Sequence, residues 1–364
     1  MRVTLEDVCE KGASNLKQSD VVSMTGEYPI YGAAGYIGNV DFYHQEKPYV
    51  AIVKDGAGIG RTTLHPAKSS VIGTMQYLLP KDNVLPEYLY YVVRHMHLEK
   101  YFTGATIPHI YFRDYKNEKF NLDSLDKQAE IVKILAKAES VILKRRQQLT
   151  ELDNLIKARF VEMFGDPVQN PLKWVTKSLL EMGYCKNGVN FHSGDSGIEI
   201  HCLGVGDFKD YSVVDGTDYL PTISLSEEPP EESMLQDGDI VFVRSNGNKA
   251  LVGRCLVVYP HNTPTTYSGF CIRYRLTSDE VNTSYLLRVL KADSMRKKMI
   301  GRGANIQNLN QKTLATLNIP IPPLKLQEQF AAFVNQTDKS KVVVQKALDE
   351  AQTLFDSLMQ EYFG

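Results

Sequence analysis

The sequence lacks several features that would assign it to a familiar class of protein. No apolar run approaches the roughly 18–20 residues that a membrane span needs, and residues 1–7 lack the apolar core of a signal peptide. The five cysteines form no CxxC pair, so we expect reduced thiols in a cytoplasm and no disulfide framework. The formal net charge of −2 disfavours a uniformly basic nucleic-acid binder and leaves local basic patches for such binding.

Motifs for catalysis are also missing. There is no GxxxxGK(S/T) phosphate-binding loop, and the glycines of residues 56–60 lack the strand–helix context of a nucleotide site, which favours a hairpin turn. His95 and His97 are two positions apart on a predicted helix, which makes them a poor metal pair. Ser193 beside His192 has no third partner for nucleophilic catalysis. We therefore expect no catalytic residue and no metal site in this chain.

What the sequence does contain is a long heptad pattern in residues 125–165. Its mostly apolar positions step by four and three from Ile131 to Met163, the spacing of a coiled-coil helix. No proline or glycine interrupts the pattern before Gly165, and Asp166-Pro167 then ends it. Such a helix would be about 50–60 Å long. The alternative interpretation is a long core helix of a larger bundle.

The same stretch occurs twice. Residues 324–364 align with residues 125–165 without a gap, 199 positions later in the chain. The identical pairs are Leu125/Leu324, Gln128/Gln327, Leu149/Leu348, Glu151/Glu350, Leu155/Leu354, Glu162/Glu361, Phe164/Phe363 and Gly165/Gly364. Before each helix, residues 50–54 parallel 240–244 and residues 59–61 parallel 252–254; near the domain starts, Cys9 and Cys185 align at an offset of 176. The chain is therefore a tandem duplication.

These observations predict an α+β protein with pseudo-two-fold internal duplication. We expect a β-rich domain over 1–124, a helix over 125–165, a second β-rich domain over 166–323 and a second helix over 324–364. The two heptad stripes need partners, and pairing them antiparallel would separate the two domains. Polar stripe positions, namely Arg145, Arg159, Thr337 and Lys341, either fix the register of this pair or mark where it turns toward other subunits.

Within the β-rich domains, residues 49–53 and 70–79 are predicted strands, and a helix should begin at Pro86. Between Asp210 and Val243 the sequence has nine acidic residues and no Lys or Arg. We interpret this segment as a solvated acidic face that points away from any nucleic acid.

The duplicated arrangement resembles the specificity (S) subunit of type I restriction–modification enzymes. The resemblance covers essentially the whole chain and rests on the order and repetition of short motifs: residues 28–32, 58–60, 160–167, 252–254 and 319–329. The proline-rich entry before the second helix is replaced by residues 121–125 before the first, which leaves the exit of the first domain less defined.

The resemblance implies two target recognition domains that each read half of a bipartite, asymmetric DNA site, with the helices setting the spacer. It implies double-stranded DNA, two methyltransferase subunits and a restriction (nuclease/translocase) subunit as partners, in the cytoplasm and without a membrane. S-adenosylmethionine would be held by the methyltransferase subunits, which methylate adenine at N6, and this chain would bind no cofactor. Arg145, Arg159 and Lys341 would lie on the docking helices.

Base recognition needs Arg or Lys for guanine and Asn or Gln for adenine, on loops over a rigid sheet. The densest such loops predict these DNA-binding residues: Lys54, Arg61, Thr106, His109, Arg113, Arg244, Asn246, Asn248, Lys249, Arg254, Arg302, Asn305, Gln307 and Asn308. For each of them a solvated loop residue is the alternative. The alternative for the whole chain is a coiled-coil adaptor with peptide-binding β domains, which the acidic segment and the net charge favour.

Overall fold

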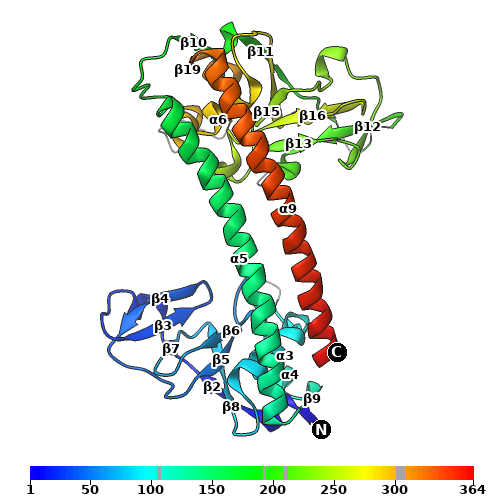
Figure 1. Ribbon diagram of the computed structural model, residues 1–364. Coiled ribbons are helices and arrows are strands. Elements are labelled where there is room, and N and C mark those ends of the chain that lie inside the picture. Colours follow the sequence, from blue (N-terminus) through cyan, green and yellow to red (C-terminus); the bar gives the residue numbers. More distant parts are fainter. Residues whose placement is uncertain (105–107, 192–193, 195, 209–211, 301–307) are drawn as a thin grey trace. The chain divides into compact units, whose positions relative to one another are not determined.

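The computed structural model describes residues 1–104, 108–191, 194, 196–208, 212–300 and 308–364. It divides into unit 1, Met1–Gln148 with Val344–Gly364, and unit 2, Leu149–Val343. Each unit contains one part of helix α5 (Leu125–Phe164) and one part of helix α9 (Leu324–Phe363) (Figure 1). The predicted fold class, α+β with two β-rich domains and two long helices, is confirmed. No helix formed by the described residues has the length and apolar character of a membrane span.

Unit 1 contains a four-stranded sheet in the order β2-β8-β5-β6, a three-stranded sheet β4-β3-β7 and the pair β1-β9. Its strands are β1 Arg2–Thr4, β2 Cys9–Ala13, β3 Tyr28–Gly32, β4 Gly35–Val40, β5 Tyr49–Val53, β6 Thr62–His65, β7 Ser70–Val71, β8 Met75–Pro80 and β9 Lys119–Asn121. Its short helices are α1 Leu5–Val8, α2 Gln18–Val21, α3 Pro86–His95, η1 Leu98–Tyr101 and α4 Phe112–Tyr115.

Unit 2 contains a five-stranded sheet in the order β11-β18-β15-β16-β13, a three-stranded sheet β14-β12-β17 and the pair β10-β19. Its strands are β10 Thr176–Ser178, β11 Gly183–Asn187, β12 Ile198–Leu203, β13 Val213–Asp215, β14 Thr222–Leu225, β15 Asp239–Val243, β16 Cys255–Tyr259, β17 Thr265–Tyr267, β18 Cys271–Leu276 and β19 Asn318–Pro320. Its short helices are η2 Leu179–Glu181, η3 Val205–Asp207, η4 Glu231–Ser233, η5 Lys249–Leu251, α6 Thr283–Lys291, α7 Asp293–Ile300 and α8 Gln311–Ala315.

The two units share one topology. The order β2-β8-β5-β6 of unit 1 matches β11-β18-β15-β16 of unit 2, and β4-β3-β7 matches β14-β12-β17, including the parallel pairing of the last two strands. Unit 2 differs by strand β13, which lies in the sequence between the equivalents of β3 and β4 and pairs parallel with β16. An insertion at this hairpin therefore contributes to the larger size of the second domain.

The central strand of each larger sheet is buried along its whole length. All five residues of β5 and all five of β15 are buried, because helices and neighbouring strands cover both faces. After its first residue, each strand continues with four apolar residues. This composition is expected of a strand whose two faces are both covered. The predicted strand over 49–53 and the predicted helix start at Pro86 are confirmed.

Within each unit, α5 and α9 pack against each other through residues of their heptad stripes. Every stripe position from Ile131 to Met163, and every equivalent position from Phe330 to Tyr362, is buried or half-buried. In unit 1 the beginning of α5 and the end of α9 share one core, and in unit 2 the end of α5 and the beginning of α9 do. The two helices therefore run antiparallel in each unit (Figure 1).

A buried glutamine joins the start of each long helix to the domain before it. The amide oxygen of Gln128 accepts from the backbone N–H of Leu85 (2.8 Å), and its nitrogen donates to two backbone carbonyls. Gln327 makes the same three bonds in unit 2, where its amide oxygen accepts from the N–H of Asn282 (2.9 Å). Both side chains are fully buried. A buried amide must be hydrogen-bonded, so this identity in the two repeats has a structural reason.

Two expectations about secondary structure are corrected by the structure. Residues 70–79 form no single strand: the chain leaves β7 at Val71 and enters β8 at Met75, because Gly73 turns against the backbone of residues 14–16. The helix that begins at Pro86 ends at His95, so His97 lies outside it in a left-handed conformation (φ 51°). Neither difference changes the topology of the sheets.

The alignment of the domain starts also shifts. Strand β1 (Arg2–Thr4) pairs with β9, and strand β10 (Thr176–Ser178) pairs in the same way with β19. The starts of the two domains are therefore 174 positions apart in the sequence. Cys9 therefore corresponds to Gly183, two residues before Cys185, because strand register and not residue identity sets the equivalence.

The acidic segment is not uniformly solvated. Asp239 is 1% exposed and forms an ion pair with Arg275 of β18 (2.8 Å). The other acids of this segment that form ion pairs do so at the surface, such as Glu232 with Lys186. Asp210 lies outside the described residues.

Candidate nucleic-acid interface

The same turn follows the central strand in both units. In unit 1, Gly60 donates its N–H to the carbonyl of Val53 and the N–H of Val53 donates to the carbonyl of Arg61, both at 2.9 Å. In unit 2 the bonds from Gly253 and Val243 are the same and have the same length. Both glycines have positive φ (80° and 76°), a backbone conformation that residues other than glycine rarely adopt. The repeated glycine therefore has a backbone reason and places Arg61 and Arg254 equivalently.

A second loop joins this turn in each unit. The N–H of Ile110 donates to the carbonyl of Lys54 (3.0 Å), and an isolated bridge links Asp55 with His109. In unit 2 the N–H of Leu309 donates to the carbonyl of Arg244 (2.8 Å), and the corresponding bridge links Ser245 with Asn308. The structure thus brings together loops that the sequence separates by more than fifty residues. In each unit, two predicted reading loops become one surface at the end of the central strand.

The unit 1 surface is built from cations, one histidine and exposed aromatic rings. His109 Nδ1 lies 2.7 Å from a carboxylate oxygen of Asp55, and Lys54 lies half-buried beside the same carboxylate. Arg61 donates to the carbonyl of Ala33 (2.9 Å), which orients its guanidinium. The side chain of Arg113 is 79% exposed and stacks over the ring of Tyr111 at 4.9 Å. These groups combine hydrogen-bond donors with flat apolar surface.

The unit 2 surface is richer in amides. Asn248 caps helix η5 by accepting from the N–H of Ala250 (3.0 Å), and Asn246 accepts from the N–H of Asn248 (2.8 Å). Arg244 donates to the carbonyl of Gly269 (3.2 Å), which holds it half-buried. Asn308 is exposed, as is Lys249, whereas Arg254 is half-buried. The amide oxygens of Asn246 and Asn248 therefore shape the loop.

Four predicted residues cannot be placed. Thr106, Arg302, Asn305 and Gln307 lie outside the described residues.

Sequence reasoning missed the exposed aromatic side chains beside these loops. Phe102 is 60% exposed next to the bridge of Thr103 with His109, and Phe270 is 62% exposed. The backbone carbonyl of Phe270 accepts from the N–H of Arg244 (2.8 Å), so its ring belongs to the unit 2 loop surface. No spacing in the sequence indicates that these phenylalanines are exposed, since Phe usually enters a core.

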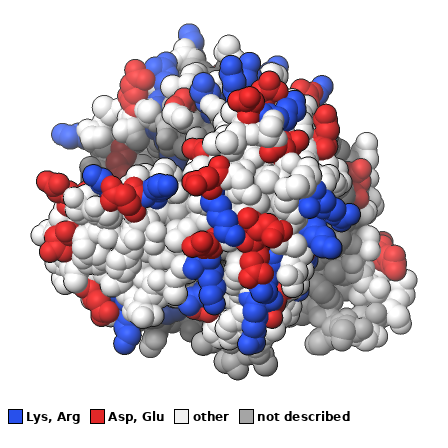
Figure 2. Space-filling model, turned by 90° about the horizontal axis from the view of Figure 1, so that it is seen from below, with Lys and Arg blue, Asp and Glu red and all other residues white. Residues whose placement is uncertain are grey.

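Charge is not gathered by sign over the surface that Figure 2 shows. Lys and Arg side chains are interspersed there with Asp and Glu side chains.

The polar stripe residues of the helices have local partners. Lys341 of α9 forms ion pairs with Asp153 of α5 (2.5 Å) and Asp338 (3.0 Å), and its side chain is only 20% exposed. Arg159 pairs with Glu162 (2.8 Å), and Arg145 donates to Gln148 (2.9 Å). The bond between Lys341 and Asp153 joins the two helices, which favours a role for Lys341 in their register. The docking role of these three residues stays a prediction.

Comparison with known proteins gives a consistent result. The family model described as "Type I restriction modification DNA specificity domain" matches residues 1–154 and 210–351. The chain is similar to the type I restriction enzyme StySPI specificity subunit of Salmonella potsdam, with 29% identity over 180 residues, 48% of this chain and 38% of that protein. It is also similar to the MjaVIII specificity subunit of Methanocaldococcus jannaschii, with 21% identity over 336 residues, 85% of this chain and 77% of that protein.

A solved structure shares the fold. The type I restriction–modification S subunit from M. genitalium has a TM-score of 0.59 and 16% identity, and the alignment covers 100% of this chain and 96% of that one. At this identity the likeness shows the architecture alone.

Proposed function

Because the chain belongs to the type I restriction modification DNA specificity family, we propose that it is the sequence-recognition subunit of a type I restriction–modification complex. Each unit reads one half of a bipartite, asymmetric DNA site. The chain recognises the DNA sequence, while separate methyltransferase subunits hold S-adenosylmethionine and methylate adenine at N6. A restriction subunit joins the assembly through them. The predicted domains, 1–124 and 166–323, are the two target recognition domains, and 125–165 and 324–364 are the helices between them.

The observation that supports this function most directly is the repeated pairing of loops. The bridges Asp55–His109 and Ser245–Asn308 occupy equivalent places at the end of equivalent strands. A rigid sheet that presents two joined loops is the arrangement in which side chains can be held against base edges. The duplication of backbone with divergence of side chains is what reading two different half-sites requires.

The two surfaces differ in the chemistry that recognises bases. Arg and Lys side chains donate to the two acceptors of guanine, and Asn pairs with adenine. Unit 1 presents Lys54, His109 and Arg113, whereas unit 2 presents Arg244, Asn246 and Asn308. The exposed rings of Phe102 and Phe270 add apolar surface for a thymine methyl group or for insertion at a base step. We therefore expect two unlike half-sites.

The test uses the full chain assembled with its methyltransferase subunits. The complex should methylate one bipartite site, and its DNA affinity should fall steeply with added salt because phosphate-bound counterions are released. His109→Ala should relax specificity in one half-site only, and Asn308→Ala in the other only, by about 1–3 kcal/mol at the contacted base pair. Lys133→Gln, an exposed change on α5, is the control and should leave both half-sites unchanged. Variants that relax both half-sites together would contradict this assignment.

We extend the proposal to the docking of the methyltransferase subunits on the helices. Besides the predicted Arg145, Arg159 and Lys341, both repeats keep exposed apolar residues at equivalent positions: Leu143 (68%) with Val342 (70%), and Leu155 with Leu354. Apolar side chains repeated at exposed positions are expected where the same partner binds twice. Leu143→Gln should weaken co-purification with the methyltransferase subunits, and the neighbouring Lys144→Gln should not. Equal retention of both variants would argue against this surface.

The helices should also set the length of the spacer between the half-sites. Matched insertions of one heptad in α5 after Gln148 and in α9 after Val343 keep the heptad stripe in phase. They lengthen the helix pair by about 10 Å. The methylated site should then gain a few base pairs of spacer with both half-sites unchanged. Altered half-site sequences would mean that the helices do not act as a ruler.

The second candidate is a protein–protein adaptor, favoured by the acidic residues of unit 2 and the low net charge. Salt dependence separates the two functions. An adaptor would bind peptides with weak salt dependence and would show no preference among DNA sequences, whereas specific DNA affinity falls by orders of magnitude with salt.

A further inference from the structure

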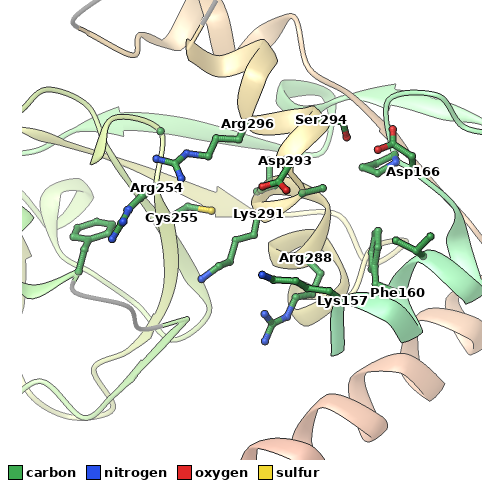
Figure 3. A pocket seen from close by; sticks show the side chains of 16 residues that line it. Lys157, Phe160, Asp166, Arg254, Cys255, Arg288, Lys291, Asp293, Ser294 and Arg296 are labelled. Carbon is green, nitrogen blue, oxygen red and sulfur yellow. The ribbon is translucent and has the colours of Figure 1, made fainter. Parts of the chain in front are cut away.

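Unit 2 contains a cavity of about 480 Å³ beside helices α6 and α7. Its cationic lining comes from four elements: Lys157 of α5, Arg254 of the repeated turn, Arg288 and Lys291 of α6, and Arg296 of α7. Figure 3 shows Arg254, Arg296 and Lys291 around Cys255, and Arg288 and Lys157 further along the lining beside Phe160. Two acidic residues, Asp166 and Asp293, also line it. The lining is therefore predominantly positive.

The lining acids compensate these cations only in part, since Asp293 attracts Arg296. Asp166 accepts from the backbone N–H groups of Val168 and Gln169, both at 2.9 Å, so its charge is directed to its own loop. Asp293 begins helix α7 with its side chain exposed. Among the described residues, the Nε atoms of Arg288 and Arg296 are buried and lack a hydrogen-bond partner. A buried donor without an acceptor is costly, and an anion in the cavity would supply the acceptor.

Burial also acts on the charges themselves. It lowers the pKa of Arg288 and the pKa of Lys291, and each of these groups carries a positive charge next to the other. Asp153 and Asp338 attract Arg288, but both carboxylates already pair with Lys341. Part of this charge has protein partners, since Lys291 donates to the hydroxyl of Ser212 (2.7 Å) and Arg296 donates to the carbonyl of Ala250. The buried Nε groups of Arg288 and Arg296 remain for a bound anion, which poor solvation would stabilise.

The equivalent place in unit 1 is neutralised. Tyr91 and Arg94 of α3 occupy the positions of Arg288 and Lys291, three and six residues after the equivalent Tyr88 and Tyr285. Arg94 pairs with Glu139 (2.5 Å) and lies over the ring of Phe355 at 5.0 Å. Tyr91 donates to the same carboxylate (3.1 Å). The shared fold therefore does not require a cationic cavity, and unit 2 has acquired one.

The rest of the lining indicates the shape of the ligand. Phe160, Phe208 and Leu290 add apolar surface to the lining, and Figure 3 shows Phe160 beside Lys157 and Arg288. A volume of about 480 Å³ lies within the range of roughly 300–1,000 Å³ that small-molecule sites have. Guanidinium groups bind phosphate through paired donors, and apolar surface suits a flat ring. We propose that this cavity binds a free phosphorylated ligand of mononucleotide size, with phosphate on Arg288, Lys291 and Arg296 and its ring against Phe160.

Calorimetric titration of the full chain with adenosine triphosphate tests the proposal, without methyltransferase subunits and without DNA. One molecule should bind per chain, and inorganic phosphate should compete weakly. Arg288→Gln should reduce the affinity on the order of tenfold to a hundredfold, because a charged hydrogen bond is lost. Lys297→Gln removes an exposed charge of the neighbouring helix α7 that does not line the cavity and should leave the affinity unchanged. Arg94→Gln tests the equivalent place in unit 1 and should also leave it unchanged.

Fluorescence of Trp174, the only tryptophan and a residue of unit 2, reports whether each variant is folded. If Arg288→Gln unfolds, Lys157→Gln replaces it, since this lysine is exposed and should weaken binding several-fold. No heat from adenosine triphosphate or phosphate would overturn the proposal, as would affinities unchanged in both variants. A duplex oligonucleotide that displaces the nucleotide would also overturn it, because the phosphates would then be those of DNA.

Discussion

The larger sheets of the two units have the same strand order and register but different side chains on one face. In unit 1, Tyr49 of β5 and Tyr77 of β8 are fully buried and meet edge to face at 5.0 Å. Strand pairing places Asp239 and Arg273 of unit 2 at these positions. The buried Arg273 lies 3.9 Å from Asp239 and stacks over the ring of Tyr184 at 4.9 Å.

The same backbone therefore accommodates an aromatic cluster in unit 1 and a buried ionic cluster in unit 2 at equivalent positions. The third position of this face is His65 of β6 in unit 1 and Val258 of β16 in unit 2, each paired with the first residue of the central strand. Hydrogen bonds between strands do not depend on the side chain, so the register survives. An aromatic cluster and an ionic cluster then differ in how they respond to mutation and pH.

The largest effect should come from the ionic cluster. Asp239→Asn leaves Arg273 and Arg275 without their carboxylate in a buried site, which should destabilise unit 2 by about 3–5 kcal/mol. Denaturant unfolding followed by Trp174 fluorescence measures this change. Tyr49→Phe is the counterpart in unit 1 and removes only the hydrogen bond from Ser69 (2.9 Å), about 1 kcal/mol. Equal losses in the two variants would show that the ionic cluster is no more demanding than the aromatic one.

Unit 1 should instead be sensitive to acid. Burial lowers the pKa of His65 from 6.5 to about 4, so the unfolded chain binds a proton between these values that the folded chain does not. Stability should therefore fall as the pH drops from 6.5 to 4, by up to about 3 kcal/mol. His65→Phe keeps an aromatic ring beside Tyr49 and should remove this component of the pH dependence. Thermal unfolding of both proteins across this pH range makes the comparison, and parallel curves would contradict it.

Replacing either of the two buried glutamines should lower stability by a similar amount, because both make the same hydrogen bonds. Gln128→Leu and Gln327→Leu each leave one backbone N–H and two carbonyls without their partner. Each should cost about 2–3 kcal/mol, because unpaired buried groups lose their solvation. Denaturation of the two variants should give similar losses. A large loss in only one would mean that the repeats attach their helices differently.

The smallest effect concerns the cationic cavity of unit 2. Lys291 is half-buried, donates to the hydroxyl of Ser212 (2.7 Å) and faces Cys255, Arg288, Asp153 and Lys341; desolvation is the main cause of its lowered pKa. It should lose its charge at a lower pH than an exposed lysine, so nucleotide affinity should weaken several-fold between pH 7 and 9.5. Lys291→Arg keeps its charge over this range and should flatten the profile. Calorimetry at several pH values measures both, and identical profiles would exclude a role for this titration.

Much of the fold was predictable from local patterns. The heptad stripe from Ile131 to Met163, the helix end at Gly165 and the duplication depend on residues close in the chain, and each is visible as spacing or identity. Gly165 shows why such signals are reliable: its φ of 75° ends the helix, and a side chain there would meet Pro171 at 2.4 Å. The candidate loops were predictable too, since Asn, Arg and Gly cluster after a buried strand.

The sequence by itself determined that two β-rich domains alternate with two matched helices, because periodicity and repetition are properties of neighbouring residues. Only the tertiary structure decided that Asp239 is buried, that Cys9 corresponds to Gly183, and that loops around Lys54 and His109 form one surface. These facts depend on which strand lies opposite and in which register, and distant residues set both. The cationic cavity belongs to this second class, since its charged residues come from α5, α6, α7 and a turn that no local spacing connects.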